Sequence, residues 1–329
     1  MNLTPIVLYN ISSATPASFQ QMLTIPSSSL INSTYTNIRF RDGNYNLLVS
    51  WLESYTVSSA VFWILLPNGI AADSAMTVYM ETGNLSDNFL DGITVGEAPQ
   101  LSATYGQYDN GAIVFTNYWN FAGTSLPSGW INNGGVTATV NNGLTLSYGS
   151  APAAANWSSV GITYQNLNLH GSDSVVENLI SFSSIVNNTR GILFIESNAT
   201  DAYSIAFTTY AAVLSNPTNY AAYQPTADSG ALGAGTQQFS AGVYAIAGVV
   251  NIASTNKIVF TYNYDSETST LQAESVTAYY LAIGFGESSD PSVSVTWLRV
   301  RAYPPNNVMP IQINRLSSVV KILPDGVAI

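Results

Sequence analysis

Short stretches in which apolar and polar residues alternate recur along the whole chain, and turn-forming residues separate them. Alternation with a period of two residues is typical of β-strands that have one buried face. The clearest example runs from Val136 to Tyr148, where two alternating stretches flank Asn141-Asn142-Gly143 and predict a hairpin. No window combines helical periodicity with capping residues. The pattern therefore predicts an all-β chain with at most one or two short helices.

Strands are predicted at short intervals, and Asn-Gly or Asp-Gly dipeptides, which readily adopt the positive φ of tight turns, lie between several of them. The predicted strands include residues 37–40, 60–66, 76–80, 113–115, 136–140, 144–148, 192–196, 203–208, 257–262, 279–285 and 293–300. A polar, turn-rich stretch at residues 96–112 predicts a domain boundary. We therefore expect two β-sandwich or jelly-roll domains in tandem, at residues 1–100 and 110–305, and a C-terminal extension at 306–329.

The C-terminal extension has an apolar pattern of its own. Pro304-Pro305 ends the preceding strand, because proline cannot donate to a ladder, yet residues 311–316 and 319–323 again have the composition of strands. Two interpretations stay open. The extension either clamps its own domain or, as we slightly prefer, adds a strand to the sheet edge of a neighbouring molecule.

Composition excludes several classes of function. Of the 329 residues, 47% are hydrophobic and 8% charged, with eight Lys and Arg, one His, no Cys and a net charge of −11. The lack of Cys excludes disulfides, a Cys-based zinc site and a Cys nucleophile. The few cations and the negative charge argue against nucleic-acid partners and against docking on anionic membranes, and no apolar run is long enough to insert into a membrane. The N-terminus lacks a signal-peptide pattern, so either a signal was removed or the protein reaches the exterior without one, for example in a viral particle assembled inside its host.

Five sequence elements in a fixed order resemble a small β domain of unknown function found in archaeal and bacterial surface proteins. The resemblance covers roughly residues 5–85, and Glu81-Thr82 departs from it, because the family usually has an aromatic residue before Gly-Asn. The elements are Phe19-Gln20, Arg39-Phe40-Arg41-Asp42, Trp51-Leu52-Glu53, Val61-Phe62-Trp63-Ile64 and Thr77-Val78-Tyr79-Met80, followed by Gly83-Asn84.

The second region resembles the concanavalin A-like, or laminin G-like, sandwich. Its opening contains Phe115 and Leu126-Pro127-Ser128-Gly129-Trp130, and its closing strand contains Trp297-Leu298-Arg299-Val300-Arg301. The resemblance implies that the first and last strands pair, so that the domain spans roughly residues 112–305. This fold serves lectins, glycosidases and structural proteins alike, so it does not by itself define a function.

Candidate catalytic groups are sparse. Glycosidases need two carboxylates about 5 Å apart, and the nearest pairs are Asp265 with Glu267 and Glu287 with Asp290. Both pairs are predicted to lie in polar turns after strands, so solvated turn carboxylates are the preferred interpretation. His170, the one histidine, has no carboxylate nearby in the sequence and is predicted to lie in a loop. We therefore expect no catalytic residue.

Candidate metal and sugar sites in this sequence also have simpler interpretations. Asp42-Gly43-Asn44 and Asp87-Asn88 with Asp91-Gly92 are oxygen-rich, but turns with Asx hydrogen bonds are the simpler explanation. We predict no cofactor and no metal, with calcium as the alternative because sandwiches of this kind sometimes bind it. Trp51, Trp63 and Trp297 lie inside alternating strands and are predicted core residues. The residues predicted to stack on sugar rings are Tyr118, Trp119, Trp130 and Trp157.

These features predict a non-enzymatic structural or adhesive protein on an archaeal virion or cell surface, such as a turret, spike or fibre. The expected partners are other copies of the chain or other coat proteins, and host surface glycans. The alternative is a secreted or cell-surface carbohydrate-binding protein, and a glycosidase is a less favoured third.

Overall fold

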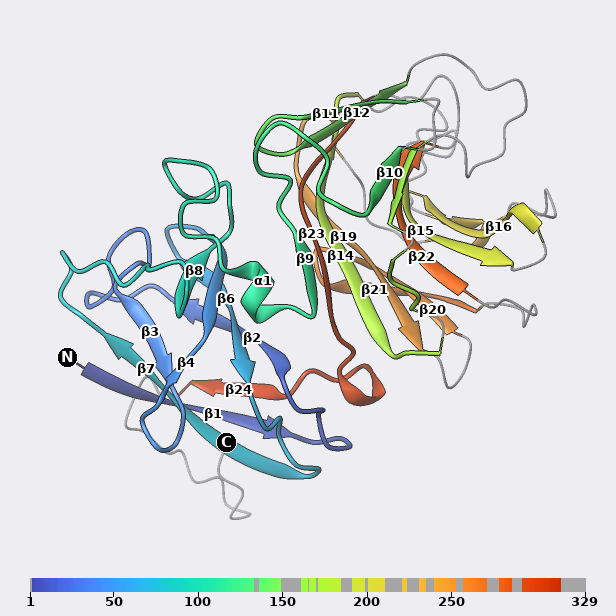
Figure 1. Cartoon of the computed structure of the whole chain (residues 1–329). Coiled ribbons are helices and arrows are strands. Elements are labelled where there is room, and N and C mark those ends of the chain that lie inside the picture. Colours follow the sequence, from blue (N-terminus) through green and yellow to red (C-terminus); the bar gives the residue numbers. More distant parts are fainter. Residues whose placement is uncertain are drawn as a thin grey trace. The chain divides into compact units, whose positions relative to one another are not determined.

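The computed structural model confirms that the chain is nearly all β (Figure 1). The chain divides into a first unit, formed by Met1–Leu101, Gln107–Val114 and the chain from Pro304, and a second unit, formed by Ser102–Gly106 and Phe115–Tyr303. No described helix is long and apolar enough to cross a membrane. The structure describes residues 2–132, 136–148, 161–164, 166–169, 171–184, 191–198, 201–210, 221–223, 231–234, 240–252, 257–270, 278–285 and 292–314.

Two sheets form the first unit, one with the strand order β24-β1-β7-β3-β4 and one with the order β2-β6-β5-β8. Phe40 on β3 and Phe62 on β6 join the sheets, with ring centroids 5.2 Å apart. Trp51 and Trp63 are fully buried, as predicted. The elements of this unit are β1 (Asn2–Asn10), β2 (Phe19–Pro26), β3 (Ile38–Arg41), β4 (Leu47–Leu48), β5 (Ser50–Tyr55), β6 (Ser59–Leu66), β7 (Ser74–Thr82), β8 (Val95–Glu97), α1 (Gly111–Val114), the 3₁₀ helix η4 (Pro305–Asn307) and β24 (Ile311–Asn314).

The prediction of a strand at residues 113–115 is wrong, because residues 113 and 114 belong to the short helix α1. Asp109 accepts a hydrogen bond from the backbone N–H of Gly111 at 3.0 Å, and Ile113 N–H donates to the carbonyl of Asn110 at 2.8 Å. Asp109 is also fixed by Trp51, whose Nε1 donates to it at 2.9 Å. A capping carboxylate held by a core tryptophan thus outweighs the β-propensity of Ile113 and its neighbours.

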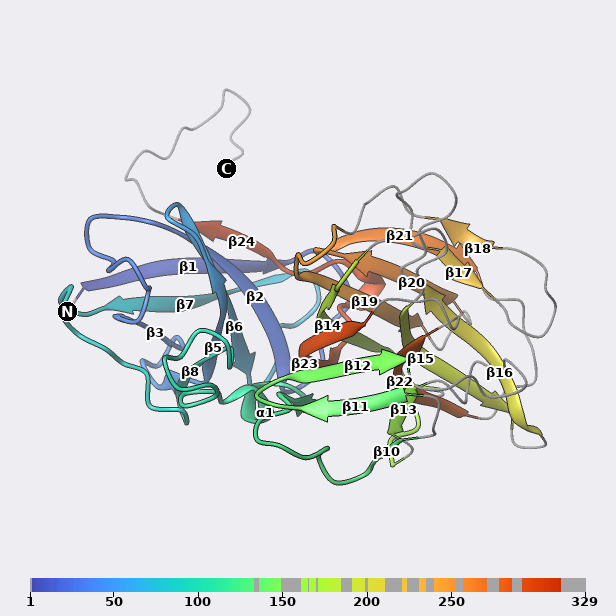
Figure 2. The same cartoon turned by 90° about the horizontal axis from the view of Figure 1, so that it is seen from above.

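The C-terminal segment completes the first unit. β24 pairs antiparallel with β1, and the amide side chain of Gln312 bonds both backbone groups of Thr24 on β2, at 2.7 and 2.8 Å. Figure 2 shows β24 beside β1. For residues 311–314 the preferred intermolecular interpretation is therefore wrong, and the alternative, a clamp on the chain's own domain, is what the structure shows. One side chain ties the two sheets together at their edges. Residues 319–323 lie outside the described residues.

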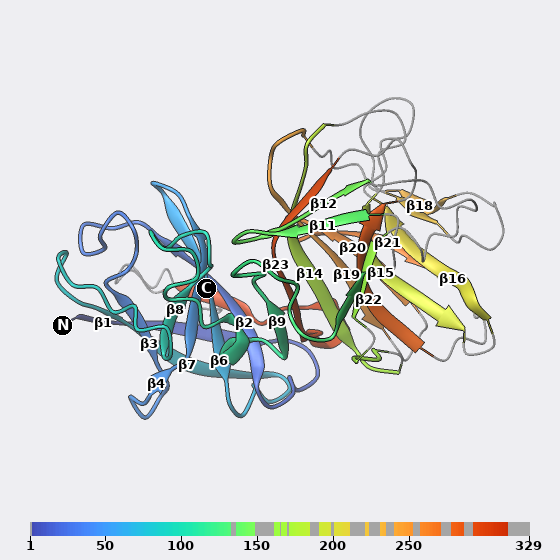
Figure 3. The same cartoon turned by 45° about the horizontal axis from the view of Figure 1, so that its top comes forward.

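Two larger sheets form the second unit, with the orders β10-β13-β22-β15-β16-β17-β18 and β11-β12-β23-β14-β19-β20-β21, and β9 pairs with β23 (Figure 3). The predicted hairpin is confirmed as β11 and β12, and so is the pairing of the first and last strands, with Trp119 opposite Leu298. Trp297 is fully buried, as predicted. The strands are β9 (Asn117–Trp119), β10 (Trp130–Asn132), β11 (Val136–Val140), β12 (Leu144–Tyr148), β13 (Gly161–Tyr164), β14 (Ser174–Phe182), β15 (Gly191–Asn198), β16 (Asp201–Tyr210), β17 (Ala221–Tyr223), β18 (Ala231–Ala234), β19 (Ala245–Ile252), β20 (Lys257–Tyr262), β21 (Asp265–Thr270), β22 (Ala278–Phe285) and β23 (Val293–Ala302).

A buried ionic cluster lies between β14 and β23. Glu177 accepts hydrogen bonds from Arg299 Nε at 2.8 Å and from Arg301 Nε and Nη2 at 3.0 and 2.7 Å. Arg299 also donates to the Tyr264 hydroxyl at 3.0 Å. Burial by itself would raise the pKa of Glu177, but the charges and hydrogen bonds of the two arginines outweigh it and lower the pKa from 4.5 to about 2.

Replacing Glu177 tests this cluster. Because its pKa is lower in the folded chain, the ionised carboxylate stabilises the fold above about pH 4.5, and this stabilisation is lost as the pH falls towards 2. Glu177→Gln leaves two buried guanidinium groups without their carboxylate, so the free energy of unfolding should fall by about 3–5 kcal/mol at pH 7. Denaturant titrations at pH 7 and pH 3 measure this, and the variant should lose less stability than the wild type between the two.

The matched control is Asp73→Asn, which removes the same charge at an exposed residue of the first unit. It should change the free energy of unfolding by less than about 0.5 kcal/mol. Equal effects of the two substitutions would contradict a special role for Glu177.

Candidate functional site

Aromatic residues from β9, β10 and β13 gather in the second unit. Trp119 ends β9 and Trp130 begins β10, and their ring centroids are 5.5 Å apart in an edge-to-face arrangement. Tyr164, which is paired with Trp130 in the ladder between β10 and β13, lies 4.7 Å from Trp119 and 5.6 Å from Trp130. Phe121 lies 5.7 Å from Trp130. We call these four residues the aromatic cluster. It brings together two of the predicted sugar-stacking residues.

Burial divides the aromatic cluster into two pairs. Phe121 is fully buried and Trp130 is only 7% exposed, so both are core residues with little ring surface for a ligand. Trp119 and Tyr164 are half-buried and pack against that core. Gly129 has a φ of +89°, and a Cβ there would come within 2.6 Å of the Tyr164 ring. Position 129 therefore requires glycine. Of the four residues, Trp119 and Tyr164 form the accessible part of the aromatic cluster.

The other predicted stacking residues are not part of this cluster. Tyr118 precedes Trp119 on β9, so alternation directs it to the other face of the strand. There it stacks on Phe115, with ring centroids 6.0 Å apart, and the Arg299 guanidinium lies 4.7 Å from the Phe115 ring. Tyr118 thus borders the buried ionic cluster. Trp157 lies outside the described residues.

Tyr164 and Phe121 were missed by the sequence analysis. The signal for Tyr164 was weak, because only the register between β10 and β13, which are far apart in the sequence, places it opposite Trp130. Phe121 has a φ of +50°, which is uncommon for an aromatic residue and which no local pattern predicts.

The candidate catalytic carboxylates need one correction. Asp265 and Glu267 were expected in a turn, but both lie on β21, which pairs antiparallel with β20. The turn is formed instead by Asn263 and Tyr264, with φ values of 46° and 72°. The polar composition of this segment suggests a turn, but its backbone continues the hairpin pairing with β20. Glu287, Asp290 and His170 lie outside the described residues.

The oxygen-rich turns of the first unit bind their own backbone. Asp91 accepts hydrogen bonds from the N–H groups of residues 93, 94 and 95 at 2.8, 2.7 and 2.9 Å. Burial would raise the pKa of Asp91, but these bonds outweigh it and lower the pKa below its usual value. The pKa of Asp42 is lowered by a hydrogen bond from the Asn46 side chain. Both turns are thus Asx-bonded turns, as preferred, and no group of three or more candidate metal-binding side chains occurs among the described residues.

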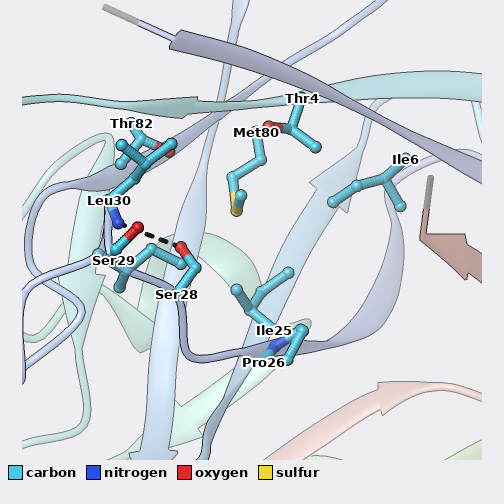
Figure 4. Close-up of a pocket in the computed structure, with 10 residues that line it drawn as sticks. Thr4, Ile6, Ile25, Pro26, Ser28, Ser29, Leu30, Met80 and Thr82 are labelled. Carbon is cyan, nitrogen blue, oxygen red and sulfur yellow. Dashed lines mark hydrogen bonds between the residues drawn. The ribbon is translucent and has the colours of Figure 1, made fainter. Parts of the chain in front are cut away.

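A pocket of about 290 Å³ opens between the two sheets of the first unit. Its walls come from β1, β7, the end of β2 and the loop that follows β2 (Figure 4). The lining is mainly apolar, with hydroxyl groups around it. The lining residues are Thr4, Ile6, Ile25, Pro26, Ser28, Ser29, Leu30, Ile31, Met80 and Thr82.

The loop on one side of this pocket is held in place by amide hydrogen bonds. Asn37 Nδ2 donates to the carbonyl of Leu30 at 2.9 Å, and its Oδ1 accepts from the backbone of Asn32 at 3.0 Å. Asn32 in turn accepts from the backbone of Thr36 at 3.0 Å. These bonds fix the pocket wall in place, and no pattern in the sequence indicates a cavity here.

Solved structures share a general likeness with parts of the chain. A GH43 glycoside hydrolase engineered to show both endo-xylanase and exo-arabinofuranosidase activity is 10% identical, with a TM-score of 0.44, over 57% of this chain and 40% of its own. The potassium-bound carbohydrate recognition domain of Emp46p is 9% identical, with a TM-score of 0.38, over 53% of this chain and 88% of its own. Such low values limit the likeness to the general β architecture.

Sequence comparison gives a more specific result. No protein-family model matches the chain, so the two resemblances stated from its motifs stay predictions. One curated protein, uncharacterized protein 562 of Sulfolobus islandicus rod-shaped virus 1, is 37% identical over 131 residues. The match covers 36% of this chain and 23% of the viral protein, so it spans about a quarter of that protein's length. Over about a third of its length, this chain therefore has a homologue in an archaeal virus.

Proposed function

We propose that this chain is a non-enzymatic structural or adhesive component of an archaeal virion, acting at the particle surface in assembly or host attachment. The observation that supports this most is the homology to a protein of an archaeal virus, at 37% identity over 131 residues. The all-β architecture agrees with such a role, since sheets give a rigid scaffold without disulfides or metals.

The use of the charged groups also supports this proposal. Glu53 accepts a hydrogen bond from Trp63 Nε1 at 2.8 Å in the core of the first unit. Glu81 is paired with Arg39 at 2.6 Å and also with Arg41, and Glu177 is paired with two further arginines. These buried carboxylates link neighbouring strands through hydrogen bonds and ion pairs, which suits them to structural work better than to proton transfer.

Carbohydrate binding is a second candidate, favoured by the aromatic cluster. Trp119 and Tyr164 have their ring centroids 4.7 Å apart, and both are half-buried on a rigid core. Such fixed aromatic surfaces suit sugar rings because little side-chain entropy is lost on binding. A virion protein that attaches to host glycans would combine both candidates.

The cellular location tests the main proposal. In cultures that produce the chain, mass spectrometry should find it in density-purified particles, enriched at least about tenfold over host surface fractions. Its ratio to the major coat protein should stay constant across the particle band. Recovery only in host fractions would reject a virion role.

Glycan binding is tested by Trp119→Ala on a glycan array. If the aromatic cluster binds sugars, the variant should lose at least about tenfold in affinity, corresponding to about 1.4 kcal/mol. Tyr45→Ala is the matched control, since Tyr45 is an exposed aromatic residue of the first unit that stacks on Tyr79. A wild-type chain that binds no glycan, or equal losses in the two variants, would remove this candidate. Trp119→Phe, which preserves more of the packing, separates loss of binding from misfolding.

The absence of catalysis is tested by incubating the chain with the same glycans and measuring new reducing ends. We expect no release above the buffer rate and no change in Asp265→Asn or Glu267→Gln. Release that either substitution abolishes would show that the chain is a glycosidase, since hydrolysis of this kind depends on a carboxylate pair.

A further inference from the structure

The sequence contains Asn-x-Ser and Asn-x-Thr sequons, which are the acceptor motif of Asn-linked glycosylation. The motif alone does not decide whether an asparagine is modified. Two further conditions apply in a folded chain, because the asparagine must be reachable and its side-chain amide must do without one of its two N–H groups. The sequons whose asparagine side chain lies among the described residues begin at Asn2, Asn10, Asn32 and Asn84.

Two of these asparagines use their side-chain amide inside the fold. Asn10 is fully buried, and its Nδ2 donates to three backbone carbonyls at 2.9, 3.0 and 3.3 Å. Asn32 Nδ2 donates to Thr36 Oγ1 at 3.0 Å and to the carbonyl of Asp87 at 3.3 Å. A glycan on Nδ2 replaces one of its two hydrogens and would break these bonds. The folded chain therefore protects Asn10 and Asn32 from modification.

Asn84 differs from both in its exposure and in its hydrogen bonds. It is exposed and lies in the turn after β7, outside the strands of the sheet. Among the described residues its Nδ2 donates one hydrogen bond, to Asp87 Oδ2 at 3.2 Å. The same oxygen accepts the backbone N–H of Asn84 at 2.7 Å, so the turn is held even without the side-chain amide. One N–H of Nδ2 is therefore available for substitution, and the other can still donate to Asp87.

The rest of this sequon is presented to solvent from a fixed backbone. Asn37, which is fully buried, donates through Nδ2 to the carbonyls of Gly83 and Asn84 at 3.3 and 3.2 Å. Leu85 is 57% exposed, and Ser86 is exposed as well. An enzyme can therefore reach all three residues of the sequon without unfolding the unit.

The sequon at Asn2 is exposed but lies within a strand. Residues 2–4 pair with residues 80–82 of β7. An enzyme that binds this sequon in its own active site would first have to detach the end of β1, at the cost of the hydrogen bonds of the ladder. Among the four, Asn84 is the site that the folded chain offers.

We propose that Asn84 carries an Asn-linked glycan, transferred from a lipid-phosphate-linked oligosaccharide. This inference rests on the proposed function, which places the chain at the surface of a particle. In the transfer, a bond forms between Asn84 Nδ2 and the anomeric carbon of the sugar, and the bond from that carbon to the phosphate oxygen breaks. The lipid phosphate leaves with the electron pair of that bond, and Nδ2 gives up one proton to a base of the transferring enzyme.

Peptide mass spectrometry of the full-length chain tests this proposal. The chain is purified, from particles and from host fractions, in cultures of an archaeal host whose own surface proteins carry Asn-linked glycans, and these proteins are the positive control. Cleavage of the denatured chain after glutamate releases residues 82–97, in which Asn84 begins the sole sequon. We expect a glycan on Asn84 in most of the molecules, and none on the peptide of residues 1–53, which contains the other three sequons.

Ser86 provides a pair of matched variants. Ser86→Ala removes the hydroxyl that the sequon requires and leaves Asn84 in place, so it should abolish the modification. Ser86→Thr keeps a hydroxyl and should retain the glycan. The same result in both variants, whether the added mass is kept or lost, would overturn the assignment to this sequon.

The outcomes separate this proposal from the proposed function. An unmodified Asn84 in a chain recovered from particles would overturn the glycan and leave the virion role standing. A glycan on Asn84 in a chain found only in host fractions would support the modification and reject the virion role. A glycan on Asn10 or Asn32 would overturn the hydrogen-bond criterion by which Asn84 is selected.

Discussion

The pairing of Glu177 with Arg299 and Arg301 is the constraint on which the larger sandwich depends. Glu177 is directly opposite Arg299 in the ladder between β14 and β23, and both strands lie in the interior of their sheet. A shift of one residue would turn the arginines into the apolar core and the core residues outward. The ionic cluster therefore favours the observed register of β14 on β23 over registers that are shifted by one residue.

The first unit uses the same arrangement. Glu81 on β7 is opposite Arg39 on β3, and Arg41 contacts it from two residues further along. An aromatic ring packs on an arginine in each case, Phe89 on Arg39 at 4.5 Å and Phe115 on Arg299 at 4.7 Å. Four of the eight basic residues of the chain thus serve two Arg-x-Arg pairs, each opposite one glutamate. In a chain with so few charges, these pairs replace disulfides as specific links between strands that are distant in sequence.

The local sequence pattern predicted the features of the fold that depend on interactions between residues close together in the chain. Alternation and turn dipeptides gave the all-β class and the hairpin from Val136 to Tyr148, and strand position gave the buried Trp51, Trp63 and Trp297. The pattern failed at α1, where a capping carboxylate decides the conformation, and at β21, where polar residues continue a ladder. The aromatic cluster was only half predicted, since its geometry depends on pairings between strands. The pocket lies between strands of two different sheets and the loop after β2, an arrangement that no local pattern encodes.

The chain topology has a consequence for the order of folding. Most of the second unit, Phe115–Tyr303, lies in the sequence between α1 and η4, so the first unit contains both early and late parts of the chain. β24 contains both the strand partner of β1 and Gln312, which bonds Thr24. At a synthesis rate of about 5–20 residues per second, β24 emerges on the order of ten seconds or more after β7. A truncated polypeptide therefore lacks β24 and exposes the edge of β1. Folding of the first unit therefore cannot be completed until β24 has been synthesised, after the whole of the second unit.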